Sequence, residues 1–592
     1  MKLRRFEIKR YRSIRSLELD TDDFLVLIGP NNHGKSNFFY ALDLYLRSSS
    51  KITSDDFFNR ETNLPIELTG TFDNLTEPEM EKLRPWTVEG KLTVRKQYSY
   101  GEDGKITTNY WALLRLPNEP WLNEDFEDYN EREAVATLPL YAYLPQTGKI
   151  SRDTYAKAIK EYVSANPEQV TYQTEFRQNP AGFKQVLDGY LPELQLVPAV
   201  RDATDETKTS SNSTLLGRLV GSVIERTSQN NPSYQNVVQS LQNLKSTIEG
   251  PTQEQKMPEI RELEERIKRE LLGWPVDVKI GVEPPDAKSV LAIGTRITID
   301  DGFPTEISQK GHGLQRAMMF AFIRIWASLI GAGSGTTRSR SNIFAFEEPE
   351  LFLHPQICRQ TYEALKRIST VDQVFLCSHS PHFVSLEDYR SIVIIRKTDP
   401  SEGTKSFRAE EDLFPGDLKK QFHMIQFFNP DRNELFFARK VALVEGASEK
   451  AVLPLLGKRM GIYDYRVSII DCSTKFNLIL YMKVLNAFKI PHLVIHDEDP
   501  VDPELQPGGV RYDHQRLQDA NHVFNENENI RSTLDSTVGS RHMVSPDLES
   551  LLNVSKSSAE KLGKPYACVE KYNDENTLIP AELQDLVRLV FS

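Results

Sequence analysis

The sequence predicts an α/β protein with two α/β domains, the first of which is interrupted by a helical insertion. Near the N-terminus, the apolar run in DFLVLIGP precedes an apolar helical pattern, as a buried strand before a helix would. Strands and helices alternate again from Asn342 to about Arg396, and a new strand–helix–strand rhythm begins at Val441 and runs almost to the C-terminus. Such alternation is typical of parallel sheets covered by helices.

The length of the chain supports this division, because 592 residues exceed what one hydrophobic core normally holds. Runs typical of β-strands extend from Pro65 to about Leu116, and residues 151–195 have a helical pattern. We therefore expect five segments: an N-terminal lobe at 1–150, a helical insertion at 151–275, a second lobe of the same domain at 276–396, a connector at 397–440 and a C-terminal α/β domain at 441–592.

One segment of the insertion has a clear amphipathic pattern. From Pro258 to Leu271, apolar residues recur three and four positions apart with charges between them, which predicts a helix. This helix either packs on its own domain or forms one arm of a helical hairpin that binds a partner.

The composition indicates a globular protein of the cytoplasm. Hydrophobic residues make up 39% and charged residues 26% of the chain, and no apolar segment follows the charged N-terminus as in a signal peptide. The longest apolar run, Ala317 to Gly333, contains Arg324 and is too short to span a bilayer. Four widely spaced cysteines are expected to be reduced and buried. The net charge of −12 gives no global sign of nucleic-acid binding, although a local groove matters more than the sum.

A phosphate-binding loop is predicted at GPNNHGKS, between the strand FLVLI and the helix pattern that follows it. Glycines let the backbone curl so that N–H groups and a helix N-terminus face phosphates, the lysine supplies positive charge, and the serine hydroxyl can ligate Mg²⁺. The expected ATP-binding residues are Gly29, Asn31, Asn32, Gly34, Lys35 and Ser36.

The second element of this site is IFAFEEPE, in which four apolar residues end in two carboxylates. Glu347 is expected to hold the shell of the Mg²⁺ ion, and Glu348 to polarise the attacking water as a general base. The alternative is a strand that runs into a solvated acidic loop. This alternative is less favoured because the same chain contains the phosphate loop.

Two further elements complete the set. In SQKGHGLQRAMMF, a turn containing Ser308, Gly311 and Gly313 would present a hydroxyl and backbone N–H groups at the start of an apolar helix. QVFLCSHSPHF ends a strand at His379, where an imidazole could sense a γ-phosphate.

These four elements, in this order, resemble the ABC-type ATPases of the SMC/RecF kind. The resemblance implies a homodimer or larger assembly, in which Ser308–Gly313 of one head faces the phosphate loop of another across the ATP. It also implies that LFLHP (351–355) lies at that interface, that the insertion is a dimerisation segment, and that a glutamine, for which Gln146 is the candidate, contacts the metal. Glu347 departs from the aspartate that is commonest at its position.

The C-terminal domain is expected to carry an acidic site. The strand Val441–Val444 ends at Glu445, and a helix starting near Ala447 would place Glu449 one turn in, near enough to share a cation. The strand of HLVIHDEDP leads into Asp497 and Asp499, which extended alternation would direct to one side, with Glu498 on the other. Clustered carboxylates repel one another, and Mg²⁺ or Mn²⁺ would relieve that repulsion. The alternative is an acidic patch on the surface.

This order of acidic residues at strand ends resembles the Toprim domain, and an ABC-type ATPase followed by Toprim resembles the OLD family of ATP-linked nucleases. The resemblance implies that Glu445, Glu449, Asp497 and Asp499 ligate metal, that Glu549 serves a second metal, and that Lys564 stabilises the transition state. Asp547 lies beside Glu549, and Ser473 in STKFNL is a possible minor contributor.

The main hypothesis is thus an ATP-regulated, Mg²⁺- or Mn²⁺-dependent DNA endonuclease in anti-phage defence, in which Glu445 and Lys564 act in catalysis. A helicase or a retron's reverse transcriptase with its DNA are the partners that the resemblance suggests. One alternative is a non-cleaving SMC/RecF-like ATPase that binds DNA ends, and another is a nucleotide-sensing scaffold that controls a partner.

Overall fold

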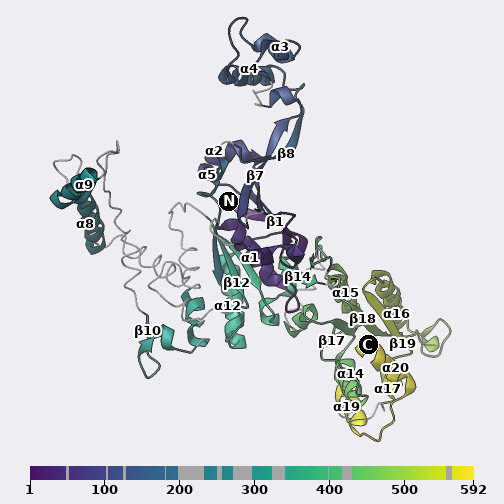
Figure 1. The fold of residues 1–592 in the computed structure, drawn as a ribbon. Helices are drawn as coiled ribbons and strands as arrows, with labels where there is room; N and C mark the ends of the chain where they lie inside the picture. The colour runs from purple at the N-terminus through teal and green to yellow at the C-terminus, as the bar shows by residue number, and fades with distance from the viewer. Residues whose placement is uncertain are drawn as a thin grey trace. The chain divides into compact units, whose positions relative to one another are not determined.

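The computed structural model divides the chain into two compact units (Figure 1), with residues 1–194, 338–343 and 384–592 in the first and residues 195–337 and 344–383 in the second. The described residues are 1–47, 52–101, 104–123, 129–180, 182–197, 232–249, 257–270, 297–311, 313–315, 317–322, 341–397, 399, 401–416, 430–554 and 563–592.

The first unit begins with a seven-stranded antiparallel sheet. Its strand order is β2-β1-β4-β6-β7-β8, with β5 beside β6. The strands are β1 (Lys2–Tyr11), β2 (Ile14–Asp20), β4 (Ile66–Asp73), β5 (Thr87–Val88), β6 (Lys91–Tyr100), β7 (Ile106–Pro117) and β8 (Tyr172–Gln178). The β-strand pattern between Pro65 and Leu116 is therefore confirmed.

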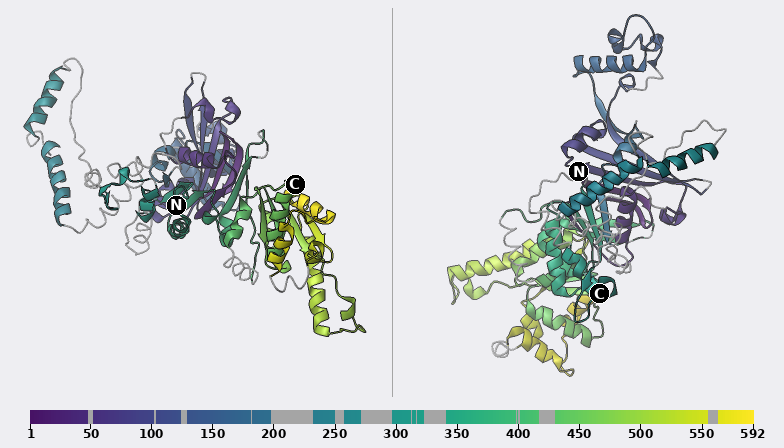
Figure 2. Two further views of the ribbon diagram at one scale, coloured as in Figure 1. Left: turned by 90° about the horizontal axis from the view of Figure 1, so that it is seen from below. Right: turned by 90° about the vertical axis from the view of Figure 1, so that its left-hand side faces the viewer.

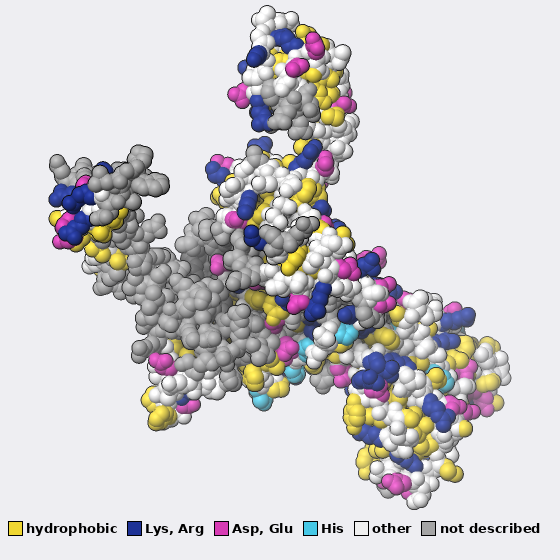
Figure 3. Space-filling view, in the orientation of Figure 1, with side chains coloured by type: hydrophobic (Ala, Val, Ile, Leu, Met, Phe, Trp, Pro, Cys, Tyr) yellow, Lys and Arg dark blue, Asp and Glu magenta, His cyan; other side chains and the backbone are white. Residues whose placement is uncertain are grey.

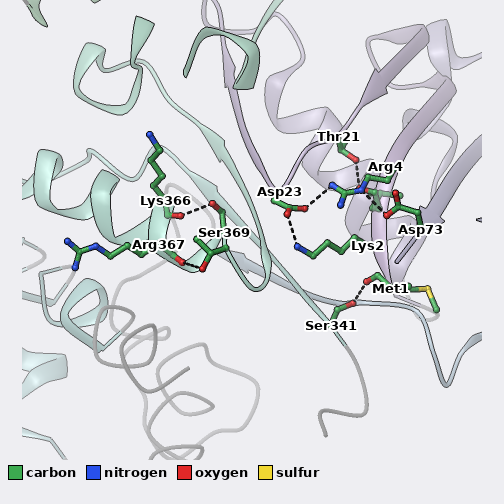
Figure 4. A network of polar contacts seen from close by, with 12 residues as sticks. Met1, Lys2, Arg4, Thr21, Asp23, Asp73, Ser341, Lys366, Arg367 and Ser369 are labelled. Atoms are coloured by element: carbon green, nitrogen blue, oxygen red, sulfur yellow. Dashed lines mark hydrogen bonds and ion pairs between the residues drawn. The ribbon is translucent and has the colours of Figure 1, made fainter. Parts of the chain in front are cut away.

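Polar contacts hold the start of β1 in place (Figure 4). Lys2 Nζ and Arg4 NH1 donate to the two carboxylate oxygens of Asp23 over 2.7 and 2.8 Å. Ser341 Oγ donates to the carbonyl of Met1 over 2.5 Å, although 340 positions separate the two residues. These contacts bring a late segment of the chain beside the first strand.

The strand before the phosphate loop lies in a second sheet. β3 (Phe24–Ile28) is completely buried and pairs in parallel with β14 (Ile392–Lys397), which pairs in turn with the antiparallel β15 (Thr404–Phe407). β3 thus enters the core as the sequence predicts, and the loop leaves at its carboxyl end.

Helix α1 (Lys35–Leu46) follows the loop and packs on the antiparallel sheet through aromatic rings. Phe6 of β1 contacts Phe38 and Tyr45 with ring centroids 5.7 and 5.3 Å apart. Tyr45 also lies against Gly70, where a Cβ would come within 2.7 Å of its hydroxyl. This packing fixes the helix whose first residues belong to the phosphate loop.

A small helical insertion separates β7 from β8, and α3 (Arg132–Val135) and α4 (Arg152–Ala165) form it (Figure 1). It has its own hydrophobic cluster, formed within residues 121–170. The helical pattern expected for residues 151–195 holds for α4 but not for β8, whose side chains are mostly exposed and therefore show no apolar alternation. Two short helices, α2 (Glu77–Leu83) and α5 (Phe183–Leu187), complete this part.

The second unit carries the remaining elements of the predicted ATPase. Two strands, β9 (Glu193–Val197) and β12 (Asn342–Glu347), cross the boundary between the units. The others are α8 (Pro232–Glu249), α9 (Pro258–Glu270), β10 (Thr298–Ile299), β11 (Thr305–Glu306), α12 (Pro355–Ile368) and β13 (Gln373–Cys377). The amphipathic helix from Pro258 is confirmed through Glu270, and Leu271 lies outside the described residues.

The C-terminal part of the first unit is a four-stranded parallel sheet, ordered β17-β16-β18-β19. Its strands are β16 (Lys440–Val444), β17 (Val467–Asp471), β18 (His492–Asp497) and β19 (Gly539–Val544). The helices are α14 (Ala447–Arg459), α15 (Leu478–Ala487), α16 (His514–Thr533), α17 (Leu548–Leu552), α19 (Lys564–Asn573) and α20 (Ala581–Phe591). One hydrophobic cluster joins the sheet to α14, α17, α19 and α20, and α16 extends away from the sheet in both views of Figure 2.

The cysteines are buried and free, as the sequence predicts: Cys358, Cys377, Cys472 and Cys568. Within the described ranges, no helix combines the length and apolar character that crossing a bilayer requires. On the face presented in Figure 3, basic and acidic side chains are interspersed over the residues drawn in colour.

Candidate functional site

The phosphate loop has the conformation that its glycines permit. Gly29 and Gly34 have φ angles of 142° and 101°, which L side chains rarely adopt. A Cβ on Gly29 would lie 2.1 Å from the carbonyl oxygen of Ile395, and one on Gly34 would lie 2.5 Å from Thr404 Oγ1. The loop therefore curls tightly against β14 and β15, and its glycines have no substitute.

Lys35 is buried at the first position of α1 and points back into the loop. Its Nζ donates to the carbonyls of Gly29 and Pro30 over 2.9 and 2.8 Å. His33 is held by the backbone N–H of Lys397, which donates to His33 Nδ1 over 2.8 Å. Burial, followed by the charge of Lys35, lowers the pKa of His33. The loop is thus positively charged at Lys35, as triphosphate binding requires.

The other predicted residues of this loop lie as follows. Asn31 and Asn32 are exposed, Asn32 has a φ of 64°, and Ser36 is partly buried in the first turn of α1. Gln146 is exposed within the helical insertion, whose separate hydrophobic cluster does not include the phosphate loop. Its role as a metal contact stays a prediction.

The paired glutamates lie at the end of β12 in the second unit. Glu347 is buried, and its Oε1 has no hydrogen-bond partner in the described structure. A buried carboxylate oxygen without a partner carries a cost that a cation would remove. This orphaned oxygen fits the predicted position of Glu347 in the shell of a nucleotide-bound Mg²⁺ ion.

Glu348 has a strained backbone and lies beside His379. Its φ is 45°, and its N–H donates to the carbonyl of Cys377 over 2.7 Å, which ties the end of β12 to β13. Its Oε1 lies 4.0 Å from His379 Nε2. The backbone N–H of His379 donates to Glu350 over 2.6 Å, as does Ser378 Oγ over 2.9 Å. The predicted general base and the predicted phosphate sensor are therefore neighbours.

The predicted signature turn lies in the same unit. Ile307–Gln309 form a 3-10 helix, the side chain of Ser308 lies outside the described residues, and the residues after Gly313 are helical. A Cβ on Gly313 would approach the carbonyl oxygen of Phe352 at 3.1 Å, so this turn lies against the LFLHP segment. Phe352 is exposed with a φ of 63°, and the interface expected at LFLHP stays a prediction.

The acidic site forms at the carboxyl ends of the parallel C-terminal strands. Glu445 follows β16, and its Oε1 accepts a hydrogen bond from the backbone N–H of Asp497, the last residue of β18, over 2.8 Å. Asp497 Oδ1 in turn accepts from the N–H of Leu548 over 2.9 Å. The structure thus brings together two acids that are 52 positions apart in the sequence.

Burial and mutual repulsion make these acids unusually weak. Burial, then the charges of Glu445, Glu449 and Asp499, raise the pKa of Asp497 to about 8. Burial raises the pKa of Glu445 to about 7, although the hydrogen bond from Asp497 and the charge of Lys475 oppose the rise. Burial, then the charge of Glu549 and that of Asp471, raises the pKa of Glu449. Without a bound cation, these carboxyl groups therefore hold protons more tightly than free acids do.

Asp499 reaches the site by a different route from the expected one. β18 ends at Asp497, and Asp499 has a φ of 49°, so strand alternation does not continue to it. Lys475 holds it instead, because Lys475 Nζ donates to Asp499 Oδ2 over 2.9 Å and to the carbonyl of Asp497 over 2.6 Å. Glu498 donates its N–H to the carbonyl of Val544 and takes no part in this contact.

Glu549 and Lys564, the predicted site residues that follow the strand-end acids in the sequence, also contact each other. Lys564, at the start of α19, donates to Glu549 Oε1 of α17 over 2.8 Å. This hydrogen bond, followed by the charges of Glu549, Asp547 and Asp497, raises the pKa of Lys564 against the opposing effect of burial. Asp547 caps α17 by accepting from the N–H of Ser550 over 2.7 Å. Because α17 also supplies the N–H that binds Asp497, this pair lies next to the strand-end acids.

Sequence reasoning missed three residues of this site. Asp471 ends β17 just as Glu445 follows β16, so the apolar run Val467–Ile470 before it was a usable signal. Lys475 lies in the quoted STKFNL turn, but nothing in its spacing indicates an ion pair with Asp499. Arg432 is buried, donates to Ser473 Oγ over 2.7 Å and lies 4.0 Å from Asp471 Oδ1; no local pattern marks it.

The donor set fits a hard divalent cation. Glu445, Glu449, Asp497 and Asp499 offer only carboxylate oxygens, which Mg²⁺ and Mn²⁺ prefer. Burial, with neighbouring acids, raises the pKa of Glu445, Glu449 and Asp497, and a bound cation would oppose that rise. In the described part of the chain, no three acidic, histidine or cysteine side chains are already arranged around a point that a metal ion could occupy. Binding would therefore have to draw these side chains together.

Comparison with family models covers most of the chain. Residues 1–384 match the AAA ATPase domain family. Residues 436–499, which include Glu445, Glu449, Asp497 and Asp499, match the Toprim domain of overcoming lysogenization defect protein-like sequences.

Three curated relatives are similar over most of their length. The OLD nuclease of Thermus scotoductus is 24% identical, over 96% of this chain and 94% of that protein. The Old nuclease of Escherichia phage P2 is 22% identical over 84% and 77%, and the endonuclease GajA of Bacillus cereus is 21% identical over 84% and 75%. Among solved structures, the SMC head domain from Thermotoga maritima is 12% identical, with a TM-score of 0.27 over 69% of this chain and all of that one.

Proposed function

The chain belongs to the AAA ATPase domain family and continues into an OLD-like Toprim domain; from this premise we propose that it is an ATP-regulated, divalent-metal-dependent DNA endonuclease. The nuclease relatives, which cover most of the chain, support phosphodiester hydrolysis. The observation that carries the proposal is the junction of Glu445 and Asp497 at adjacent parallel strand ends, where several buried carboxylates gather.

Bound Mg²⁺ or Mn²⁺ would supply an activated water and neutralise charge on the phosphate. Glu445, Glu449, Asp497 and Asp499 would hold one ion and Glu549 would serve a second. The Leu548 N–H orients Asp497.

Lys564 is suited to meet the scissile phosphate. Its side chain is 63% exposed, and its partner Glu549 is one of the proposed metal ligands. With Glu549 as a metal ligand, the ammonium of Lys564 would be available to stabilise the negative charge that develops on the phosphate. Lys564 therefore acts in catalysis as a charge stabiliser.

The ATPase part regulates this activity. Lys35 and the loop Gly29–Ser36 bind the triphosphate, Glu347 completes the Mg²⁺ shell with Ser36, and Glu348 polarises water with His379 beside it. Two chains form a homodimer in which Ser308, Gly311 and Gly313 of one contact the nucleotide of the other. The exposed Phe352 next to Gly313 supports an interface at this position.

The test is cleavage of plasmid DNA in Mg²⁺ or Mn²⁺, with and without ATP. Wild type should cleave, Asp497→Ala should lose cleavage, and Asp585→Ala, which removes an exposed acid on α20, should retain it. If Asp497→Ala cleaves as well as wild type, the assigned site is wrong. If wild type binds ATP and cleaves no DNA under any of these conditions, a non-cleaving ATPase or a nucleotide-sensing scaffold replaces the proposal.

The biological setting that we propose is anti-phage defence, with a helicase or a retron's reverse transcriptase and its DNA as the candidate partners. Phage plating on cells that carry wild type or Asp497→Ala tests this role. Protection that requires Asp497 supports it, and equal plating on both strains contradicts it.

A further inference from the structure

Lys475 is a buried cation inside the acidic site. It begins the 3-10 helix Lys475–Asn477 between β17 and α15, and its side chain is 3% exposed. Its ammonium group donates to the carbonyl of Asp497 and to Asp499 Oδ2 over 2.6 and 2.9 Å. The turn that carries it is fixed by Asn477 Nδ2, which donates to the carbonyl of Cys472 over 2.8 Å. The position of the cation is therefore set by the fold.

The contact between Lys475 and Asp499 conflicts with metal binding at Asp499. An ammonium group occupies lone pairs of the same carboxylate that a divalent cation would use, and it repels that cation. Asp499 also has a left-handed backbone, with a φ of 49°, while its side chain meets the lysine. Without metal, Lys475 thus supplies the positive charge that Asp499 needs.

We propose that Lys475 is the counter-ion of Asp499 in the metal-free protein and must release that carboxylate when a divalent cation binds. The inference rests on the proposed metal site and adds a positioning residue to it. It also makes Lys475 a determinant of metal affinity.

If Lys475 had only a structural role, its removal would have the opposite effect on metal affinity. If Lys475 only braces the segment Asp497–Asp499, its loss should disorder that segment and weaken metal binding. If Lys475 competes with the metal, its loss should strengthen binding, because the site gains one net negative charge. The direction of the change in affinity distinguishes these roles.

The experiment is calorimetric titration of the nucleotide-free full chain with Mn²⁺ alone. We expect Lys475→Met to lower the dissociation constant by about 5-fold, within the range that one nearby charge produces. Lys475→Arg, which keeps the charge, should stay within about 2-fold of wild type by the same reasoning. Unchanged or weaker binding by Lys475→Met overturns the inference. If Asp497→Ala binds Mn²⁺ as wild type does, the proposed metal site itself fails.

Thermal unfolding gives a second readout that does not require activity. In EDTA, Lys475→Met should melt at a lower temperature than wild type, and Mn²⁺ should raise its Tm by more than it raises that of wild type. If Lys475→Met does not fold, Lys475→Gln keeps a donor without the charge and should show both effects at smaller size. A Lys475→Gln protein whose Tm in EDTA and response to Mn²⁺ equal those of wild type also overturns the inference.

Discussion

Glu445 Oε1 and the backbone N–H of Asp497 are joined by a 2.8 Å hydrogen bond that ties the end of β16 to the end of β18. Burial and the neighbouring acids raise the pKa of Asp497 to about 8, and burial raises that of Glu445 to about 7, against ordinary values of 3.8 and 4.5. The metal-free fold therefore binds protons that the unfolded chain releases.

This difference predicts that the metal-free protein loses stability as the pH rises. Through Glu445 and Asp497, the folded chain binds more protons than the unfolded chain up to about pH 8, which lowers the free energy of unfolding as the pH rises. Burial lowers the pKa of His492, His496 and His542, which gives the opposite slope while the histidines of the unfolded chain titrate, so the two acids determine the slope above about pH 7. In EDTA, we therefore expect the transition that contains the C-terminal domain to melt at a lower temperature at pH 8.5 than at pH 7. Differential scanning calorimetry of wild type and Asp497→Asn measures this.

The controls change the charge of the acidic site, either by removing an acid or by adding a cation. Asp497→Asn removes one titrating acid, so its Tm should depend less on pH, and saturating Mg²⁺ should raise the wild-type Tm more at pH 8.5 than at pH 7. A wild-type Tm in EDTA that is constant or rises between pH 7 and 8.5 would contradict the proton count.

Lys35→Ala should weaken ATP binding while preserving the fold. The ammonium group of Lys35 donates to the loop carbonyls of Gly29 and Pro30, so its loss removes positive charge from the phosphate site. We expect affinity for a fluorescent ATP analogue to fall at least about 10-fold, as the loss of a charge-assisted contact implies. Lys91→Ala, at the exposed start of β6, is the matched control. Equal affinity of wild type and Lys35→Ala would remove this loop from the site.

Glu348→Gln should retain ATP binding and lose hydrolysis. The amide keeps the shape of a side chain that lies 4.0 Å from His379 but cannot accept a proton from water. Phosphate release should fall about 100-fold or more, the usual contribution of a general base. Glu350→Gln is the informative contrast, because Glu350 accepts hydrogen bonds from Ser378 Oγ and from the backbone N–H of His379. Because those two hydrogen bonds, rather than complete burial, hold this partly buried carboxylate, Glu350→Gln should lower the Tm, whereas Glu348→Gln should not. Hydrolysis by Glu348→Gln at the wild-type rate would exclude it as the base.

The strand-end motifs are predictable from the sequence because their chemistry is local. The phosphate loop GPNNHGKS requires a strand before it and a helix after it. The sequence shows both, β3 and α1, as adjacent apolar patterns. Glu445 and Asp497 are likewise marked by the apolar strands that precede them, β16 and β18. In a parallel sheet, the carboxyl ends of neighbouring strands lie at the same edge, so the two acids are expected to meet there.

The remaining parts depend on contacts between distant positions. β8 has mostly exposed side chains, so only its pairing with β7 makes it a strand. Asp499 meets Lys475 through a left-handed turn that strand alternation does not predict. Arg432 precedes β16 and reaches Ser473 in a different loop. Long polar side chains can reach in many directions, and the packed fold selects one.

Arg432→Met should destabilise the acidic edge of the C-terminal sheet. Arg432 is 4% exposed, donates to Tyr481 Oη and Ser473 Oγ over 2.7 Å each, and lies 4.0 Å from Asp471 Oδ1. Its removal takes one hydrogen-bond partner from the buried Tyr481 and one from the exposed Ser473, and it leaves Asp471 without this nearby positive charge. We expect the free energy of opening of the amides in β16 and β17 to fall by about 3 kcal/mol, as for the loss of one partner from a buried charged network.

Hydrogen–deuterium exchange measures this effect locally, which matters because a chain of several domains does not unfold in one step. Tyr481→Phe is the matched variant, since it removes only the Arg432–Tyr481 hydrogen bond, and the expected cost is about 1 kcal/mol. If the amides of β16 and β17 are equally protected from exchange in the two variants, Arg432 does not act through Ser473 and Asp471. If Arg432→Met loses more protection and Mg²⁺ restores none of it, the arginine supports the edge of the sheet independently of the metal site.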